Sequence, residues 1–160
     1  MYYKMLNKAI YLLTEYEIYD YPIEKDIIAQ IIEDNNLRHV VLNNLSVSCI
    51  IDKEILTPKL DDKNYRETII HEIGHACNHT GSTLKKNKYV VGKEEKQANA
   101  FAAYFLMPIF VFEELLNLGY NDFELSEEFG VNIEFVKFRK ELTEALKHDG
   151  YFNDLNDYQN

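Results

Sequence analysis

A five-residue run near the middle of the sequence, His71-Glu72-Ile73-Gly74-His75, has the residue types and spacing of a catalytic metal site. Residues four apart lie on one face of a helix, so the two imidazoles can turn toward one ion. Glu72 falls about 100° away around the helix, where it can take a proton from water at an open coordination position. The run therefore predicts metal ligands at His71 and His75 and a catalytic acid and base at Glu72.

The alternative for this run is two ordinary histidines on a helix that binds no metal. Gly74 argues against that alternative, because glycine in a helix interior costs about 1 kcal/mol relative to alanine. A glycine at this position would allow another helix to approach the ligand face closely. We therefore expect a second helix to pack against the Gly74 side of the first.

A catalytic zinc ion takes three protein ligands and a water, so the third ligand must come from elsewhere in the chain. A third histidine six residues after His75 would fall at position 81, which is Gly81. Carboxylates are then the candidates, and Glu94 and Glu95 open the next helical pattern. The helical face that Glu95 shares carries small residues: Ala98, Asn99 and Ala102. Glu95 is therefore preferred over Glu94, the alternative being a solvated carboxylate at a helix start.

The identity of the metal stays open at this point. Two imidazoles and one carboxylate suit Zn²⁺, but Mn²⁺, Fe²⁺ or Co²⁺ can occupy the same triad because N and O ligands discriminate weakly among them. Tyr89 is a candidate hydrogen-bond donor to the oxyanion of a tetrahedral intermediate. His79, one turn after the run, is expected to contact the carbonyls at its helix end rather than a metal.

The elements that position these residues are mostly helical. Apolar periodicity predicts two N-terminal helices, at about residues 3–19 and 24–34. Runs of β-branched residues then predict a small sheet of two or three strands, at residues 39–42, 47–51 and 55–57. Asn64 and Glu67 have the spacing of a capping box, which predicts a helix from Asn64 to about His79.

A second long helix is predicted after a loop at residues 85–92. It runs from Lys93 to Leu106 and stops at Met107-Pro108. The phenylalanines at and after its end have helical spacing beside alanines and are expected in the core: Phe101, Phe105, Phe110 and Phe112.

Two compact helical patterns near the C-terminus, at residues 122–129 and 133–146, resemble a helix-turn-helix around Gly130-Val131-Asn132. The first pattern is acidic, and the start of the second offers Asn132, Ile133 and Glu134 instead of basic residues. Only Lys137, Arg139 and Lys140 are basic. The segment is therefore expected to pack against the rest of the protein or to dock a protein, and not to bind DNA.

These patterns predict an α+β fold, mostly helical, with a small two- to three-stranded sheet packed beside the helix of the histidines. The length of 160 residues suits a single domain over 1–160. Its expected parts are N-terminal helices and sheet at 1–63, metal-site helices at 64–108, a helical part at 109–146 and a flexible tail at 147–160. Cys49 and Cys77 are expected to be reduced, since no regular spacing indicates disulfides.

The net charge of -10 repels phosphate backbones, so a direct nucleic-acid partner is not expected. No segment approaches the roughly 20 apolar residues of a membrane span, and the first ten residues lack a secretory signal pattern. We therefore expect a cytoplasmic protein without a membrane partner.

The run His71–His75, followed by Glu95-Lys96-Gln97-Ala98-Asn99-Ala100-Phe101-Ala102 and Leu106-Met107-Pro108, resembles the ImmA/IrrE family of metallopeptidases. The detailed match covers about residues 66–108. The resemblance implies a gluzincin-like core in which His71, His75 and Glu95 bind zinc and Glu72 is the catalytic acid and base. It also implies a protein substrate, a helix-turn-helix repressor cleaved to relieve repression in a mobile element, a prophage or a stress response.

Two functions from different classes follow from these observations. The first is a zinc-dependent endopeptidase. The second is a non-catalytic metal-containing protein, a sensor or antitoxin that sequesters its partner. The sequence favours the first, because a purely structural site does not need Glu72 and would normally complete its coordination with Cys or His.

Overall fold

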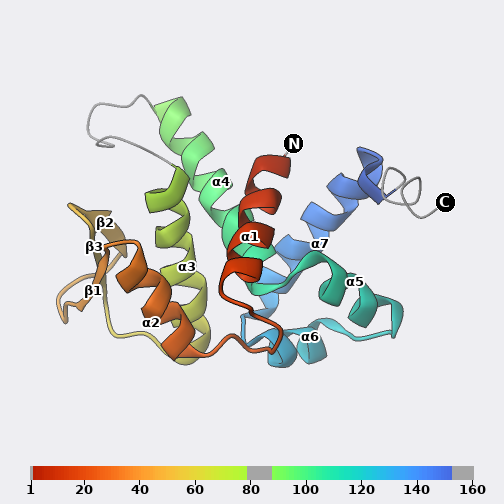
Figure 1. Ribbon diagram of the computed structural model, residues 1–160, viewed down its shortest axis with the longest axis horizontal. Helices are drawn as coiled ribbons and strands as arrows, with labels where there is room; N and C mark the ends of the chain where they lie inside the picture. The colour runs from red at the N-terminus through yellow and green to blue at the C-terminus, as the bar shows by residue number, and fades with distance from the viewer. Residues whose placement is uncertain (1, 79–87, 153–160) are drawn as a thin grey trace.

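A computed structural model describes residues 2–78 and 88–152, except for the side chains of residues 78, 88 and 89 (Figure 1). Within these ranges the chain forms seven helices and one three-stranded sheet, so the predicted α+β class is confirmed. The elements are α1 (Tyr3–Glu15), α2 (Lys25–Asp34), β1 (Arg38–Val41), β2 (Cys49–Ile51), β3 (Glu54–Thr57), α3 (Asp62–Asn78), α4 (Lys88–Leu106), α5 (Ile109–Asn117), α6 (Asp122–Phe129) and α7 (Ile133–His148).

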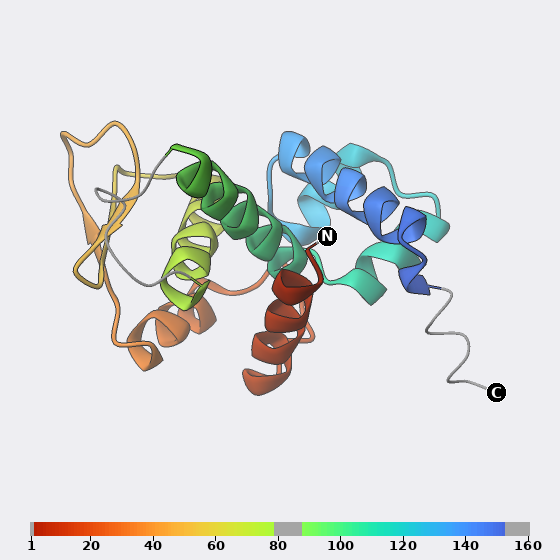
Figure 2. The ribbon, with the colours of Figure 1, turned by 90° about the horizontal axis from the view of Figure 1, so that it is seen from above.

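The three strands form one mixed sheet. Strand β3 lies in the middle, parallel to β1 and antiparallel to β2. Its Ile55 and Thr57 are fully buried, while the alternate residues are partly exposed, as expected for a sheet with one face on the core. The sheet lies at one end of the molecule and α5, α6 and α7 lie at the other, with α3 and α4 between them (Figures 1 and 2).

Helices α3 and α4 approach each other very closely at Gly74. A Cβ atom built on Gly74 would lie 2.9 Å from the Cδ1 atom of Phe101 and 3.3 Å from the Cα atom of Ala98. Since real Cβ atoms do not tolerate a contact of 2.9 Å, only glycine fits here unless the Phe101 ring moves and α4 gives way slightly. The predicted packing of a second helix against the Gly74 side is confirmed.

The N-terminus of α3 differs from the sequence prediction. The helix starts at Asp62, and the carboxylate of Asp61 accepts a hydrogen bond from the backbone N–H of Asn64 at 2.9 Å. The predicted cap at Asn64 is therefore wrong, because Asp61 supplies the capping oxygen three residues earlier. Glu67 does not close a capping box; its Oε1 atom accepts from the backbone N–H of Asn132 at 2.5 Å.

The turn between α6 and α7 packs against α3. Gly130 has a positive φ of 61°, and a Cβ atom on it would lie 2.7 Å from Pro22 Cβ and 3.0 Å from Arg66 Nη1. The predicted apolar seam is almost completely buried in the same core cluster as α1–α4: Leu125, Phe129, Val131, Val136 and Leu142. The predicted packing role of this segment is confirmed, and removing the segment would expose the main core.

Arg139 of α7 is fully buried, although it is one of the three basic residues of this segment. Its Nε atom donates to the carbonyl oxygen of Met107 at 2.9 Å, and its guanidinium lies over the rings of Tyr104 and Phe112. Burial lowers the pKa of Arg139 to about 10. Its side chain joins α7 to the end of α4 and is not available to a DNA phosphate.

Three boundaries and one side chain also differ from expectation. Helix α1 ends at Glu15, four residues early, because the backbone turns through a positive φ at Glu17. Helix α4 starts at Lys88, five residues early, and includes Gly92. A Cβ atom built on Gly92 would have open space around it. Helix α7 continues to His148, and Tyr151 beyond it stacks on Tyr3. Phe110 is 63% exposed, so its predicted place in the core is wrong.

Among the described residues, no single helix is long and apolar enough to cross a membrane. Only the consecutive pair Val90–Leu106 and Ile109–Asn117, bent by 65°, reaches that length and composition together.

Gly74→Ala is expected to destabilise the protein by about 1–3 kcal/mol, because the added methyl group overlaps Phe101 and overpacks the α3–α4 contact. The measurement is urea unfolding monitored by circular dichroism. Gly92→Ala is the matched control, since it replaces a helical glycine that has open space around it, and it should stabilise by up to about 1 kcal/mol. Equal stability of Gly74→Ala and the unchanged protein would contradict the close approach.

Candidate metal site

Helices α3 and α4 bring together three side chains that could bind a metal ion. His71 and His75 come from α3, and Glu95 comes from the N-terminal half of α4. The Nε2 atoms of the two histidines are 3.0 Å apart. Glu95 places Oε1 at 3.1 Å from His75 Nε2 and Oε2 at 3.3 Å from His71 Nε2. We call these three residues the His71–His75–Glu95 cluster.

The spacing of the donor atoms fits a small tetrahedral ion. With metal–ligand distances of about 2.0–2.1 Å, two ligand atoms of a tetrahedron lie about 3.3 Å apart. The two histidine nitrogens are 3.0 Å apart, and each lies at 3.1 or 3.3 Å from a different oxygen of the Glu95 carboxylate, close to that value. Two imidazole nitrogens and one carboxylate oxygen also form a donor set that zinc prefers. The residues present therefore fit the metal that the sequence predicted.

Asn99 orients the first histidine of the cluster. Its Oδ1 atom lies 2.8 Å from Nδ1 of His71. An amide oxygen can only accept, so Nδ1 carries the proton and the Nε2 lone pair faces the other donor atoms. The sequence placed Asn99 on the Glu95 face without giving it this role; the signal is its position one turn after Glu95 on α4.

Glu72 is buried beside the cluster, with only 5% of its surface exposed. Burial raises the pKa of Glu72 to about 7, and the nearby Glu95 carboxylate adds to this effect. No side chain in the described ranges hydrogen-bonds to the Glu72 carboxyl group. A divalent cation at the cluster would act in the opposite direction, because it favours the ionised form of an adjacent carboxyl group.

The cluster is accessible from solvent on the α4 side. The side chain of Glu95 is 50% exposed, whereas those of His71 and His75 are 18% and 13% exposed. The histidines are thus held in the helix interface while one carboxylate faces water.

The structure brings together four of the residues selected from the sequence: His71, Glu72, His75 and Glu95. Glu95, and not its neighbour Glu94, joins the two histidines. The roles of these residues as ligands and catalyst stay predictions. Tyr89 lies in the first turn of α4, but its side chain is outside the described part of the chain. The whole of His79 is also outside it.

Comparison with known proteins gives a matching sequence family and a similar solved structure. Residues 55–141 match the family described as the IrrE N-terminal-like domain, Peptidase M78. A Mycobacterium tuberculosis transcriptional regulator is similar in structure, with a TM-score of 0.66 and 19% sequence identity. The alignment covers 84% of this chain and 45% of that regulator, so the chain spans less than half of its length. At this identity the similarity shows a shared fold alone.

A search of curated protein sequences found no match. The region that matches the family contains both helices of the His71–His75–Glu95 cluster and amounts to more than half of the sequence. The chain therefore belongs to the ImmA/IrrE family, whose domain is classed with the M78 peptidases.

Proposed function

We propose that the protein is a zinc-dependent endopeptidase in which His71, His75 and Glu95 bind the metal and Glu72 is the catalytic acid and base. The observation that carries this proposal is the cluster geometry. Two imidazole nitrogens lie 3.0 Å apart, each lies 3.1 to 3.3 Å from one oxygen of the Glu95 carboxylate, and a buried carboxyl group lies beside them. A buried glutamate next to such a cluster has no evident structural purpose, because it forms no hydrogen bond to a side chain of the described residues.

Zinc, when bound, supplies a Lewis acid that activates water and polarises the scissile carbonyl group. The chain supplies the proton transfers. Glu72 accepts a proton from the attacking water and returns it to the leaving amine. Asn99 holds His71 in the tautomer that directs Nε2 to the metal, and the burial of both histidines in the α3–α4 interface fixes their direction.

The proposed substrate is a helix-turn-helix transcription repressor, cleaved to relieve repression in a mobile element, a prophage or a stress response. Membership of the ImmA/IrrE family supports this assignment, and the shared fold with a transcriptional regulator is compatible with it. A substrate of this kind would place the reaction in the cytoplasm. The net charge of -10 fits a basic protein partner better than a nucleic acid.

Glu72→Gln is expected to retain zinc and to lower repressor cleavage by at least about 10²–10⁴-fold, because it removes the proton acceptor without touching the metal ligands. Cleavage of a candidate repressor from a neighbouring gene is followed on a gel, and metal content is measured by mass spectrometry. Undiminished cleavage by the variant would rule out the proposed mechanism. An uncleaved repressor in a stable stoichiometric complex with the unchanged protein would instead favour sequestration.

Glu95→Ala should weaken zinc binding by more than the roughly 10–100-fold loss typical of an outer-shell partner, since it removes one of three proposed ligands. Glu94→Ala is the matched control, because it removes the adjacent carboxylate of the same helix turn. Competition with a chromogenic chelator measures both affinities. Equal affinities in the two variants would show that Glu95 is not a ligand.

Asn99→Ala is expected to weaken zinc binding by about 10–100-fold through loss of the hydrogen bond to His71, whereas Asn99→Asp should retain it. Lys96→Ala, an exposed change on the same helix, is the control. The readouts are zinc affinity and the NMR signal of the His71 Nδ1 proton. Unchanged affinity together with an unchanged proton signal in Asn99→Ala would remove Asn99 from the site.

A further inference from the structure

A groove on α5 has features that the peptidase reaction does not require. It has a volume of about 490 Å³ and is lined by Phe110, Glu113, Glu114, Asn117, Leu118 and Phe152. We call it the α5 groove. None of its residues belongs to the metal site, and α5 lies on the side of the molecule away from the sheet (Figures 1 and 2).

Two large apolar side chains of this groove face solvent. Phe110 is 63% exposed and Leu118 is 68% exposed, whereas Ile109 and Phe112 of the same helix are buried in the core. Helix α5 therefore has apolar residues on both faces, although only one face packs on the protein. Apolar surface left in water at the rim of a groove is typical of an interaction site.

Two acidic residues, Glu113 and Glu114, line the groove. The Oε1 atom of Glu113 is buried without a hydrogen-bond partner, and Glu114 lines the same groove. The Nζ atom of Lys147 on α7 lies 3.8 Å from Oε2 of Glu113 and 3.2 Å from Oε1 of Glu144, and the buried Arg139 also interacts electrostatically with Glu113. Lys147 thus contacts two carboxylates, and Oε1 of Glu113 remains without a hydrogen-bond partner among the described residues.

We propose that the α5 groove docks a basic, amphipathic segment of a protein partner. Apolar side chains of that segment would cover Phe110 and Leu118, and a lysine or arginine would pair with Glu113 and Glu114. A second copy of this chain fits less well, because a symmetric contact would bring these carboxylates against their own copies. Anionic membranes are repelled by the same charges and by the net charge of -10.

Docking at this groove would place the partner on a surface separate from the metal cluster. The identification of the partner with the cleaved substrate rests on the proposed function, whereas the binding itself does not. A substrate held at two places gains effective concentration at the scissile bond, so the peptide sequence at the cluster need not carry all of the specificity.

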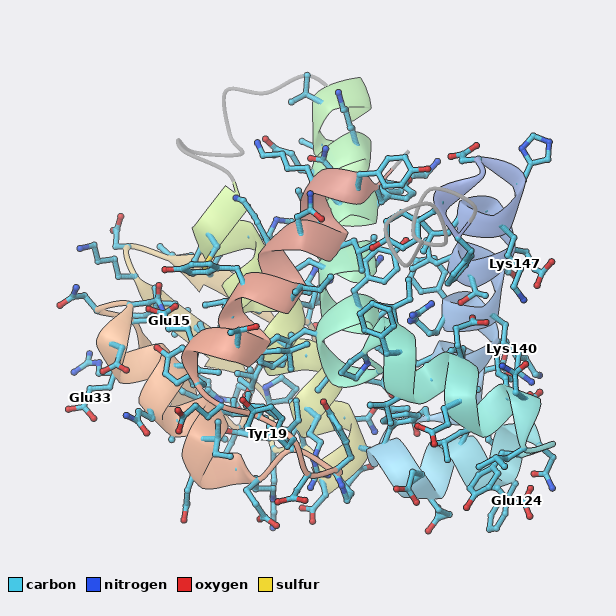
Figure 3. The ribbon with its side chains drawn as sticks, turned by 45° about the vertical axis from the view of Figure 1, so that its right-hand side comes forward. Glu15, Tyr19, Glu33, Glu124, Lys140 and Lys147 are labelled. Atoms are coloured by element: carbon cyan, nitrogen blue, oxygen red, sulfur yellow. The ribbon has the colours of Figure 1, made fainter. Side chains whose placement is uncertain are left out.

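The test uses the full chain and a fluorescent synthetic helical peptide with leucines on one face and lysines beside them. Its matched peptide carries glutamates in place of the lysines. We expect fluorescence anisotropy to show binding of the lysine peptide that is lowered about tenfold or more by Phe110→Ser or Leu118→Ser. Glu113→Gln together with Glu114→Gln should weaken binding and reduce its salt dependence. Tyr19→Ser is the control, since Tyr19 is 76% exposed and lies on another part of the surface (Figure 3).

The proposal is overturned if the lysine peptide does not bind, if the glutamate peptide binds as well, or if Phe110→Ser and Tyr19→Ser bind equally. Three further results would assign the groove to another occupant. These are Phe110-dependent binding to phosphatidylglycerol vesicles, Phe110-dependent self-association in sedimentation, and a gain in peptide affinity on removal of residues 153–160. Repressor cleavage is assayed separately with the unchanged protein, so lost docking and absent proteolysis are distinguishable.

Discussion

The contact between α3 and α4 at Gly74 sets the distance between the two helices that carry the His71–His75–Glu95 cluster. A single additional methyl group there would meet the ring of Phe101 at 2.9 Å. The two histidines lie on one helix and Glu95 on the other, so the separation of their donor atoms depends directly on this helix-to-helix distance. Because Gly74 faces Ala98 closely, the imidazoles of α3 and the carboxylate of Glu95 can meet while the backbones of α3 and α4 stay close together.

The remaining elements hold α3 and α4 in that relation. The α6–α7 turn is tied to the N-terminal half of α3 through Glu67 and the backbone of Asn132, and its Gly130 fits against Arg66 and Pro22. Arg139 ties α7 to the end of α4 through the carbonyl oxygen of Met107. The C-terminal helices therefore support the site from a distance, although none of their side chains belongs to the cluster. The segment that resembles a helix-turn-helix in sequence thus contacts both α3 and α4 and stabilises their packing.

The parts of the fold and site that could be predicted are those governed by local spacing. Helical periodicity places His71 and His75 on one face and Glu95 on the face of Ala98, and these positions agree with the observed geometry. Tertiary contacts decide the rest. Asn99 acquires its partner only when α4 lies on α3, and Asp61 competes successfully with Asn64 for the helix start. Phe110 has the spacing of a core residue, but the bend after Met107 turns it outward.

The division of the cluster between two helices has a thermodynamic consequence. An ion shared by His71, His75 and Glu95 joins α3 to α4 across the segment that connects them, and the unfolded chain offers no such preformed site. Binding then stabilises the native state by about 2.7 kcal/mol when free metal is a hundredfold above the dissociation constant. If the proposed zinc site is filled, zinc supply would change the resistance of the protein to degradation together with the proposed peptidase activity.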